Sequence, residues 1–122
     1  MSGTTAGVIF SPMGDDTHMK IFQGKTLNFE VIWGGENPID VTDYQAVMQI
    51  RDHDKEVALE MSTDNGKIQV GGSDGKLTFV GSETDSRAVE TSGEWELELK
   101  TPDGDVYRAL SGTVTPVKEI SQ

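Results

Sequence analysis

"EWELELK", from Glu94 to Lys100, is the stretch that decides the fold class of this chain, because apolar and charged residues alternate strictly along it. Trp95, Leu97 and Leu99 occupy every second position, and glutamate or lysine fills the positions around them. Successive side chains of a strand point to opposite faces, so the pattern predicts a β-strand with one face in a core and the other in water. "PDGD" follows at residues 102–105 and is typical of a turn led by proline.

The same two-residue period recurs from Ile21 onward and predicts strands on both sides of this one. They are KTLNFEVIW (25–33), QAVMQIR (45–51), EVALEMS (56–62), IQV (68–70), KLTFV (76–80) and VYRALSGTVTPV (106–117). The polar segment 81–93 predicts a loop with one helical turn. About seven strands, with turn signals roughly every eight to twelve residues, are typical of an antiparallel β-sandwich, which we place over residues 21–122.

The apolar side of these strands supplies the predicted core. We expect six alternating residues to be buried together: Leu27, Phe29, Trp33, Trp95, Leu97 and Leu99. The segment "PIDVTDY" should carry the chain from one sheet to the other and bury Ile39, Val41 and Tyr44 at the corner. Asn65-Gly66 predicts a hairpin, because both residues tolerate positive φ.

Residues 1–20 lack the strand pattern and are predicted to form an N-terminal arm. They show neither a basic start nor a long apolar run, so we expect no signal peptide. The only apolar cluster of the arm is Val8, Ile9 and Phe10. This triplet could pack back on its own sandwich, or it could reach a neighbouring subunit or another protein as an added strand. In the second case these three residues are a contact for a partner.

Two features of the sequence raise the question of metal binding. "VGGSDGKLTF", at residues 70–79, begins like a calcium-binding nonapeptide repeat, but Asp74 stands where the third glycine belongs and no second copy exists. The other aspartate clusters match no complete twelve-residue calcium loop. Aspartate at turns has a sufficient local role in bonding nearby backbone amides. We therefore expect turns at these positions and no metal or other cofactor.

Composition excludes several classes of function. The chain has 122 residues and no cysteine, which removes disulfides, thiolate zinc sites and cysteine nucleophiles. Its net charge of −11 repels phosphate backbones, so direct nucleic-acid binding is disfavoured. No apolar run approaches the roughly 20 residues that cross a bilayer, so we expect no membrane segment.

The residues that most often perform catalysis form no pattern here. His18 and His53 are the only histidines, and no serine stands in a nucleophile elbow. Glu94, Glu96 and Glu98 alternate outward on one strand, so they are solvated together and not placed across a cleft as glycosidase acids are. The sequence predicts a protein that is not an enzyme.

Residues 21–117 resemble a family of small tailed-phage virion proteins. The resemblance lies in "QGKTLNFEV" (23–31), "NPIDVTDYQAVMQIR" (37–51), "ALEMSTDNGKIQVGGSDGKLTF" (58–79) and the ending from Ser92 to Pro116. These proteins are similar to the immunoglobulin-like N-terminal domain of upper baseplate proteins. The family pattern usually has a short helix with "ALPAGRY" before the late strand, whereas "SRAVETSGEW" stands here at residues 86–95 and is more acidic, so that contact surface is expected to differ.

The resemblance implies an immunoglobulin-like sandwich and a structural role without a catalytic site. The expected function is to join or decorate tail, baseplate or fibre components of a virion assembled in the host cytoplasm. The partners would be other virion proteins, including copies of the chain in a symmetric assembly. Decoration of the capsid is an alternative. A receptor- or carbohydrate-binding module is another, but it needs exposed aromatic residues, and we expect Trp33 and Tyr107 in the core.

Overall fold

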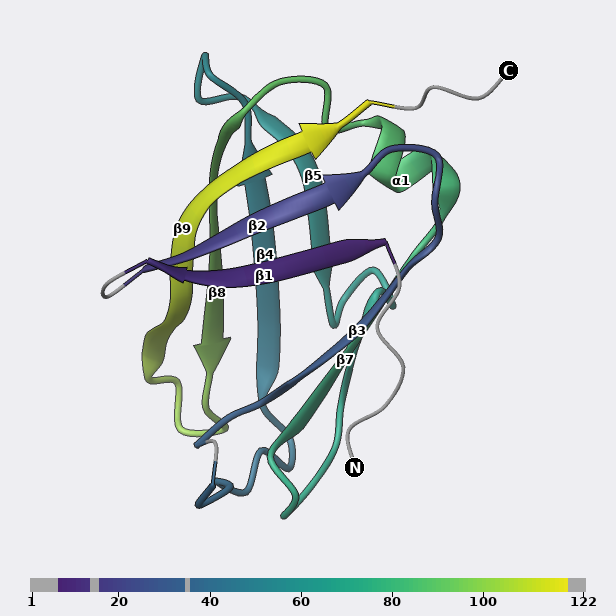
Figure 1. The fold of residues 1–122 in the computed structure, drawn as a ribbon. Coiled ribbons are helices and arrows are strands. Elements are labelled where there is room, and N and C mark those ends of the chain that lie inside the picture. Colours follow the sequence, from purple (N-terminus) through teal and green to yellow (C-terminus); the bar gives the residue numbers. More distant parts are fainter. Residues whose placement is uncertain (1–6, 14–15, 35, 119–122) are drawn as a thin grey trace.

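The computed structural model describes residues 7–13, 16–34 and 36–118, which form two β-sheets and one short helix (Figure 1). The strands are β1 (Val8–Met13), β2 (Asp16–Phe22), β3 (Leu27–Ile32), β4 (Gln45–Arg51), β5 (Val57–Ser62), β6 (Ile68–Val70), β7 (Lys76–Gly81), β8 (Gly93–Lys100) and β9 (Val106–Val117). The helix α1 spans Glu83–Arg87. The prediction of an all-β sandwich is confirmed.

The two sheets have the strand order of an immunoglobulin-like domain. The larger sheet runs β1-β2-β9-β8-β4-β5 and the smaller one β3-β7-β6. If β3 to β9 take the letters B, C, C′, D, E, F and G, the sheets contain G-F-C-C′ and B-E-D, as in variable-type immunoglobulin domains. All pairs are antiparallel except β2 with β9, which is parallel, and the β1–β2 hairpin extends the sheet beyond β9.

The predicted strands agree closely with the observed ones. The bounds of β4, β6 and β9 match the predicted segments, and the helical turn predicted within residues 81–93 is α1. This helix begins at a capping box: the Ser82 hydroxyl accepts the amide of Asp85, and the Asp85 carboxylate accepts the amide of Ser82. Polar residues therefore start the helix where the apolar alternation stops.

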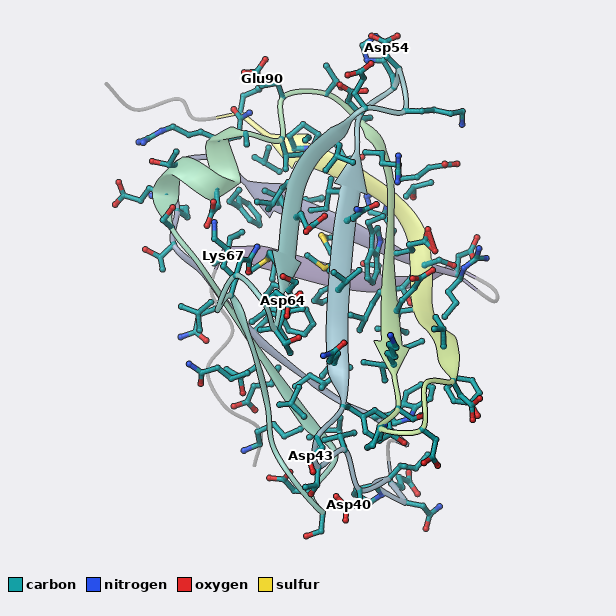
Figure 2. The ribbon with its side chains drawn as sticks, turned by 180° about the vertical axis from the view of Figure 1, so that it is seen from behind. Asp40, Asp43, Asp54, Asp64, Lys67 and Glu90 are labelled. Atoms are coloured by element: carbon teal, nitrogen blue, oxygen red, sulfur yellow. The ribbon has the colours of Figure 1, made fainter. Side chains whose placement is uncertain are left out.

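The core lies between the sheets and contains most of the predicted residues. Leu27, Phe29, Trp95, Leu97 and Leu99 are all buried, while Trp33 is half-buried against them. The corner differs: Val41 is buried and Tyr44 half-buried, but Ile39 is 43% exposed. Asp40 (Figure 2) turns the chain here by accepting the amide and hydroxyl of Thr42, so the corner buries Val41 but leaves Ile39 exposed, and the predicted burial of Ile39 is wrong.

The N-terminal arm is a correction to the sequence-based expectation. Residues 8–13 and 16–20 lie in β1 and β2, where Met19 and Ile21 enter the core; residues 1–6 lie outside the described residues. Val8 is buried, and Phe10 contacts the rings of Phe29 and Trp95 at 5.2 and 5.7 Å. The described part of the segment is thus a hairpin of the sheet, as in the alternative that packs the triplet on its own sandwich.

The Asn65-Gly66 hairpin is also corrected. β5 pairs with β4 in the larger sheet, and β6 pairs with β7 in the smaller one, so residues 63–67 cross between sheets. Only Gly66 has a positive φ, of 81°. Asn65 uses its side chain to bond the backbone of β5 instead of entering the left-handed region, and this replaces the tight two-residue turn.

At Gly112 the backbone of β9 lies directly against the start of β2. It lies opposite Trp95 in the β8–β9 pair, and a Cβ added there would lie 1.8 Å from the Thr17 carbonyl oxygen. Trp95 Nε1 donates to that same oxygen at 3.0 Å. Glycine therefore lets the hairpin approach closely enough to complete the hydrogen bond of the buried indole.

We expect Gly112→Ala to destabilise the protein by about 3 kcal/mol or more, because the Cβ would push backbone against backbone. Gly72→Ala is the matched control, since its Cβ would meet only the Thr42 hydroxyl at 3.5 Å. Urea unfolding of both variants measures the difference. Equal stabilities would contradict the close approach of β2 to β9.

Candidate binding face on the six-stranded sheet

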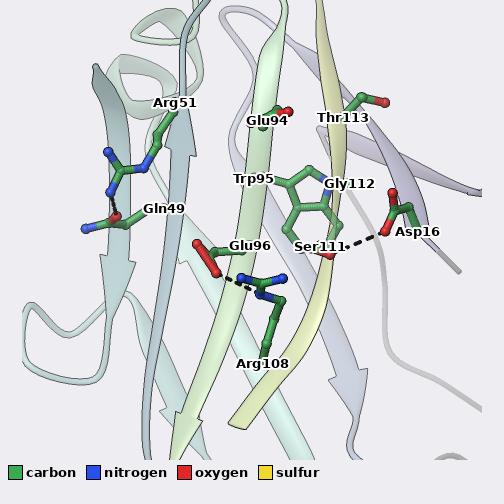
Figure 3. Close-up of a pocket in the computed structure, with 10 residues that line it drawn as sticks. All are labelled: Asp16, Gln49, Arg51, Glu94, Trp95, Glu96, Arg108, Ser111, Gly112 and Thr113. Carbon is green, nitrogen blue, oxygen red and sulfur yellow. Dashed lines mark hydrogen bonds and ion pairs between the residues drawn. The ribbon is translucent and has the colours of Figure 1, made fainter. Parts of the chain in front are cut away.

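The outward side chains of β4, β8 and β9 form a broad polar face, which we call the outer face. The strand register aligns Arg51, Glu94 and Thr113 in one row across the three strands. The next row contains Gln49, Glu96 and Ser111. Figure 3 shows these side chains with Arg108 and Asp16 over the same part of the sheet. Residues distant in sequence thus meet because the sheet places β8 between β4 and β9.

The outer face carries two hollows. The larger has a volume of about 310 Å³ and is lined by Asp16, Gln49, Arg51, Glu94, Trp95, Glu96, Arg108, Ser111, Gly112 and Thr113. The smaller has a volume of about 170 Å³ and is lined by Gln45, Ala46, Val47, Ser62, Thr63, Asp64, Glu98, Leu99, Lys100 and Val106. Both extend over β4, β8 and β9, so this sheet face is hollowed along much of its length.

Hydrogen bonds between neighbouring side chains hold the charges of the larger hollow in place. Arg51 donates to the Gln49 amide oxygen at 2.6 Å, and Gln49 donates to Glu60 at 2.8 Å. On the other side Arg108 Nε donates to Glu96 at 3.1 Å (Figure 3). The Ser111 hydroxyl reaches Asp16 at 3.4 Å. Charges of both signs are therefore ordered by lateral contacts while they remain open to solvent.

One contact near this face resembles the start of a catalytic pair. His18 Nδ1 lies 2.7 Å from the Thr113 hydroxyl. A nucleophile and base of this kind also need a group that orients the imidazole. Within the described residues the contact of His18 is to the Thr113 hydroxyl, and it brings no carboxylate to the imidazole. The pair supports the parallel contact of β2 with β9, and the expectation of a non-enzymatic protein stays a prediction.

The three residues predicted as a partner contact do not lie together on one surface. Val8 and Phe10 face the core, so they cannot form the proposed added strand. Ile9 is 50% exposed and pairs with Lys20 of β2, so it remains available, and its contact with a partner stays a prediction.

The alternation of Glu94, Glu96 and Glu98 is the sequence signal for the outer face. The arginines beside these glutamates cannot be placed from the sequence.

The aspartate clusters serve the turns in which they lie. Asp74 Oδ1 accepts the amides of Gly72 and Lys76, which closes the β6–β7 hairpin predicted at this stretch. Asp52 Oδ1 accepts the amides of Asp54 and Glu56 in the same way. Asp52, His53 and Asp54 bring three possible metal ligands within 4.8 Å of one another, but His53 and Asp54 are exposed and the Asp52 oxygen is already bonded.

We expect calcium or EDTA to shift the melting temperature negligibly, because these oxygens are bonded to backbone amides and the set lacks the six to eight ligands that calcium prefers. Thermal melts with and without millimolar calcium measure this. A rise of several degrees would indicate a metal site at one of the acidic turns.

Among the described residues, three aspartates have a lowered pKa: Asp40, Asp74 and Asp85. Hydrogen bonds from the hydroxyl and amide of Thr42 lower the pKa of Asp40, and those from the amides of Lys76 and Gly72 lower the pKa of Asp74. Burial alone would raise the pKa of Asp85, but the hydrogen bond from Lys67 Nζ, at 2.6 Å, and that from the Ser82 amide outweigh it and lower the pKa.

Acid should therefore destabilise the fold. Groups with a folded pKa below the unfolded value of about 4 contribute stability that is present above that value and is lost as pH falls through the folded pKa. The urea midpoint should fall between about pH 5 and pH 2. Asp85→Asn should reduce the size of this fall, because it removes one titrating carboxyl. An equal fall in the variant would show that Asp85 contributes nothing to it.

Comparisons with known proteins add no family to this description. No protein-family model matches the chain, and no curated protein matches it at a significant level. Within the described residues no helix has the length and apolarity to cross a membrane, since α1 has five residues.

Proposed function

We propose that this chain is a non-enzymatic structural protein of a tailed-phage virion, which joins or decorates tail, baseplate or fibre components through protein–protein contacts. The observation that carries the proposal is the hollowed outer face, where charges of both signs are ordered and open to solvent. Complementary charge patterns give protein contacts their specificity and orientation. The sequence resemblance described above supports the virion context.

The outer face suits a protein partner better than a small substrate. The larger hollow, at about 310 Å³, lies at the lower limit of small-molecule pockets, which are mostly apolar, whereas this one is lined by charged and hydroxyl side chains. The second hollow continues along the same strands. A partner surface with protruding side chains could enter both hollows at once and pair with Arg108 and Glu94.

A receptor- or carbohydrate-binding module is the weaker alternative. Tyr107 is 49% exposed, so the expectation that it lies in the core is wrong. It pairs with Leu99 near the start of β9, at the end of the sandwich, where little covers it. Among the described residues it is the one exposed aromatic, and sugar recognition by stacking usually needs more than a single ring.

The test is to mix the purified protein with the virion proteins encoded in the same genome and measure complexes by mass photometry. We expect the unmodified protein to form a complex and Arg108→Glu to lose it, because the new carboxylate would face Glu96. Lys25→Glu is the matched control, since it makes the same charge change at an exposed turn between β2 and β3. The absence of any complex would contradict the function. Equal binding by Arg108→Glu would contradict the outer face as its site.

A further inference from the structure

β5 is an edge strand of the larger sheet, and its backbone shows which groups point outward. Val47 lies opposite Ser62 in the β4–β5 register, and just beyond this pair the Thr63 amide donates to the Ala46 carbonyl at 3.0 Å. Hydrogen-bonded pairs alternate along an antiparallel ladder, so the amides and carbonyls of Ser62 and Glu60 point away from β4. An edge of this kind can pair with a strand of another chain.

The side chain of Asn65 occupies this edge. Its Oδ1 accepts the Ser62 amide at 3.0 Å, and its Nδ2 donates to the Glu60 carbonyl at 3.0 Å. Oδ1 also accepts the Lys67 amide, and the amide of Asn65 donates to the Ser62 hydroxyl. A carboxamide offers one acceptor and one donor group side by side, as a peptide unit of a neighbouring strand does.

We propose that Asn65 guards the β5 edge by taking the hydrogen bonds of a missing neighbouring strand, and that loss of its carboxamide opens the edge to pairing with a second copy of the chain. The Lys67 amide closes the same edge by donating to the Ser62 carbonyl at 3.1 Å. Lys67 follows Asn65 by two residues, so the edge is closed as long as the crossover between β5 and β6 keeps its shape. This inference is independent of the virion role.

Asn65 is also a site where spontaneous deamidation can occur, because Gly66 follows it. The backbone nitrogen of Gly66 can attack the Cγ atom of Asn65; the new carbon–nitrogen bond closes a succinimide and Nδ2 leaves as ammonia. Water then opens the ring to aspartate or isoaspartate. Gly66 has no side chain, and a Cβ added there would meet no atom within 4 Å, so no side chain hinders the attack, but the Gly66 amide donates to the Thr63 carbonyl at 3.3 Å. The three hydrogen bonds of the carboxamide oppose it in the folded chain.

The aspartate product would protect the edge only in part, because it keeps an acceptor for the Ser62 and Lys67 amides and loses the donor. A carboxylate has no N–H group, so the bond to the Glu60 carbonyl is lost and two oxygens face each other in its place. In a solution of the purified protein, another copy of the chain is the molecule that can pair with an unprotected β5 edge. Because each chain carries a net charge of −11, repulsion between copies is screened by salt, and their association should increase with salt concentration.

The experiment compares Asn65→Ala and Asn65→Asp with the unmodified protein and with Gln69→Ala, an exposed neighbour on β6. Hydrogen exchange should show the Ser62 amide exchanging about tenfold faster in Asn65→Ala, the effect of one lost hydrogen bond. Sedimentation equilibrium should show that Asn65→Ala and Asn65→Asp self-associate more strongly in high salt. Asn65→Asp keeps the acceptor for the Ser62 and Lys67 amides, so it tests the edge even if Asn65→Ala does not fold. Unchanged protection of the Ser62 amide in Asn65→Ala, or association of both variants equal to that of Gln69→Ala, would overturn the proposal.

Discussion

Deletion of residues 1–13 is expected to unfold the domain or to lower its melting temperature by more than about 10 °C. The deletion removes β1, whose Val8 is buried and whose Phe10 packs on Phe29 and Trp95. Burial of two such side chains stabilises a fold by about 3–6 kcal/mol, a large part of the total for a small domain. The deletion also leaves β2 as a bare edge beside β9.

Ile9→Ser in the full chain is the matched control for this deletion. Ile9 belongs to the same strand but is half exposed, so its replacement should change the melting temperature by only a few degrees. Circular dichroism melts of both proteins provide the measurement. If the deleted protein melts like the full chain, residues 8–13 contribute nothing to the stability of the sandwich and form an arm.

The sequence does not predict the β1–β2 hairpin because its strand signal is weak and its pairing is non-local. In β2 only Met19 and Ile21 enter the core, and β1 contains Pro12, which is unusual inside a strand. The parallel contact joins residues 19–22 to residues 114–117, at opposite ends of the chain. Periodicity reports on one strand at a time, so it could find β8 but could not show that the N-terminus completes the same sheet.

The outer face was predictable only in part for a similar reason. Alternation along β8 shows that Glu94, Glu96 and Glu98 point outward. It does not show that Arg51 and Arg108 lie on either side of them, because this depends on the order β4-β8-β9 and on the register shift between Leu97 and Glu98. The Asn65-Gly66 pair gave a turn signal, but the partners of β5 and β6 decided that the turn crosses between sheets.

Trp95→Ala is expected to cost about 3–5 kcal/mol of the free energy of unfolding, which is a large part of the total for a domain of this size. The indole is 3% exposed, it contacts Phe10, and it lies among the residues that line the larger hollow (Figure 3). Its removal leaves a cavity between the hairpin and β8. It also leaves the Thr17 carbonyl without the hydrogen bond from Nε1.

Trp95→Phe separates these two effects, because it keeps most of the apolar volume and loses the hydrogen bond. We expect Trp95→Phe to cost about 1–2 kcal/mol, so the difference between the two variants measures the packing of the ring.

Glu96→Ala tests the register of the strand. Because Glu96 points outward, its replacement should change the free energy of unfolding by less than about 1 kcal/mol. If Glu96→Ala proves costly and Trp95→Ala harmless in urea unfolding, the strand is shifted by one residue. The glutamates would then face the core, and the outer face would not exist as described.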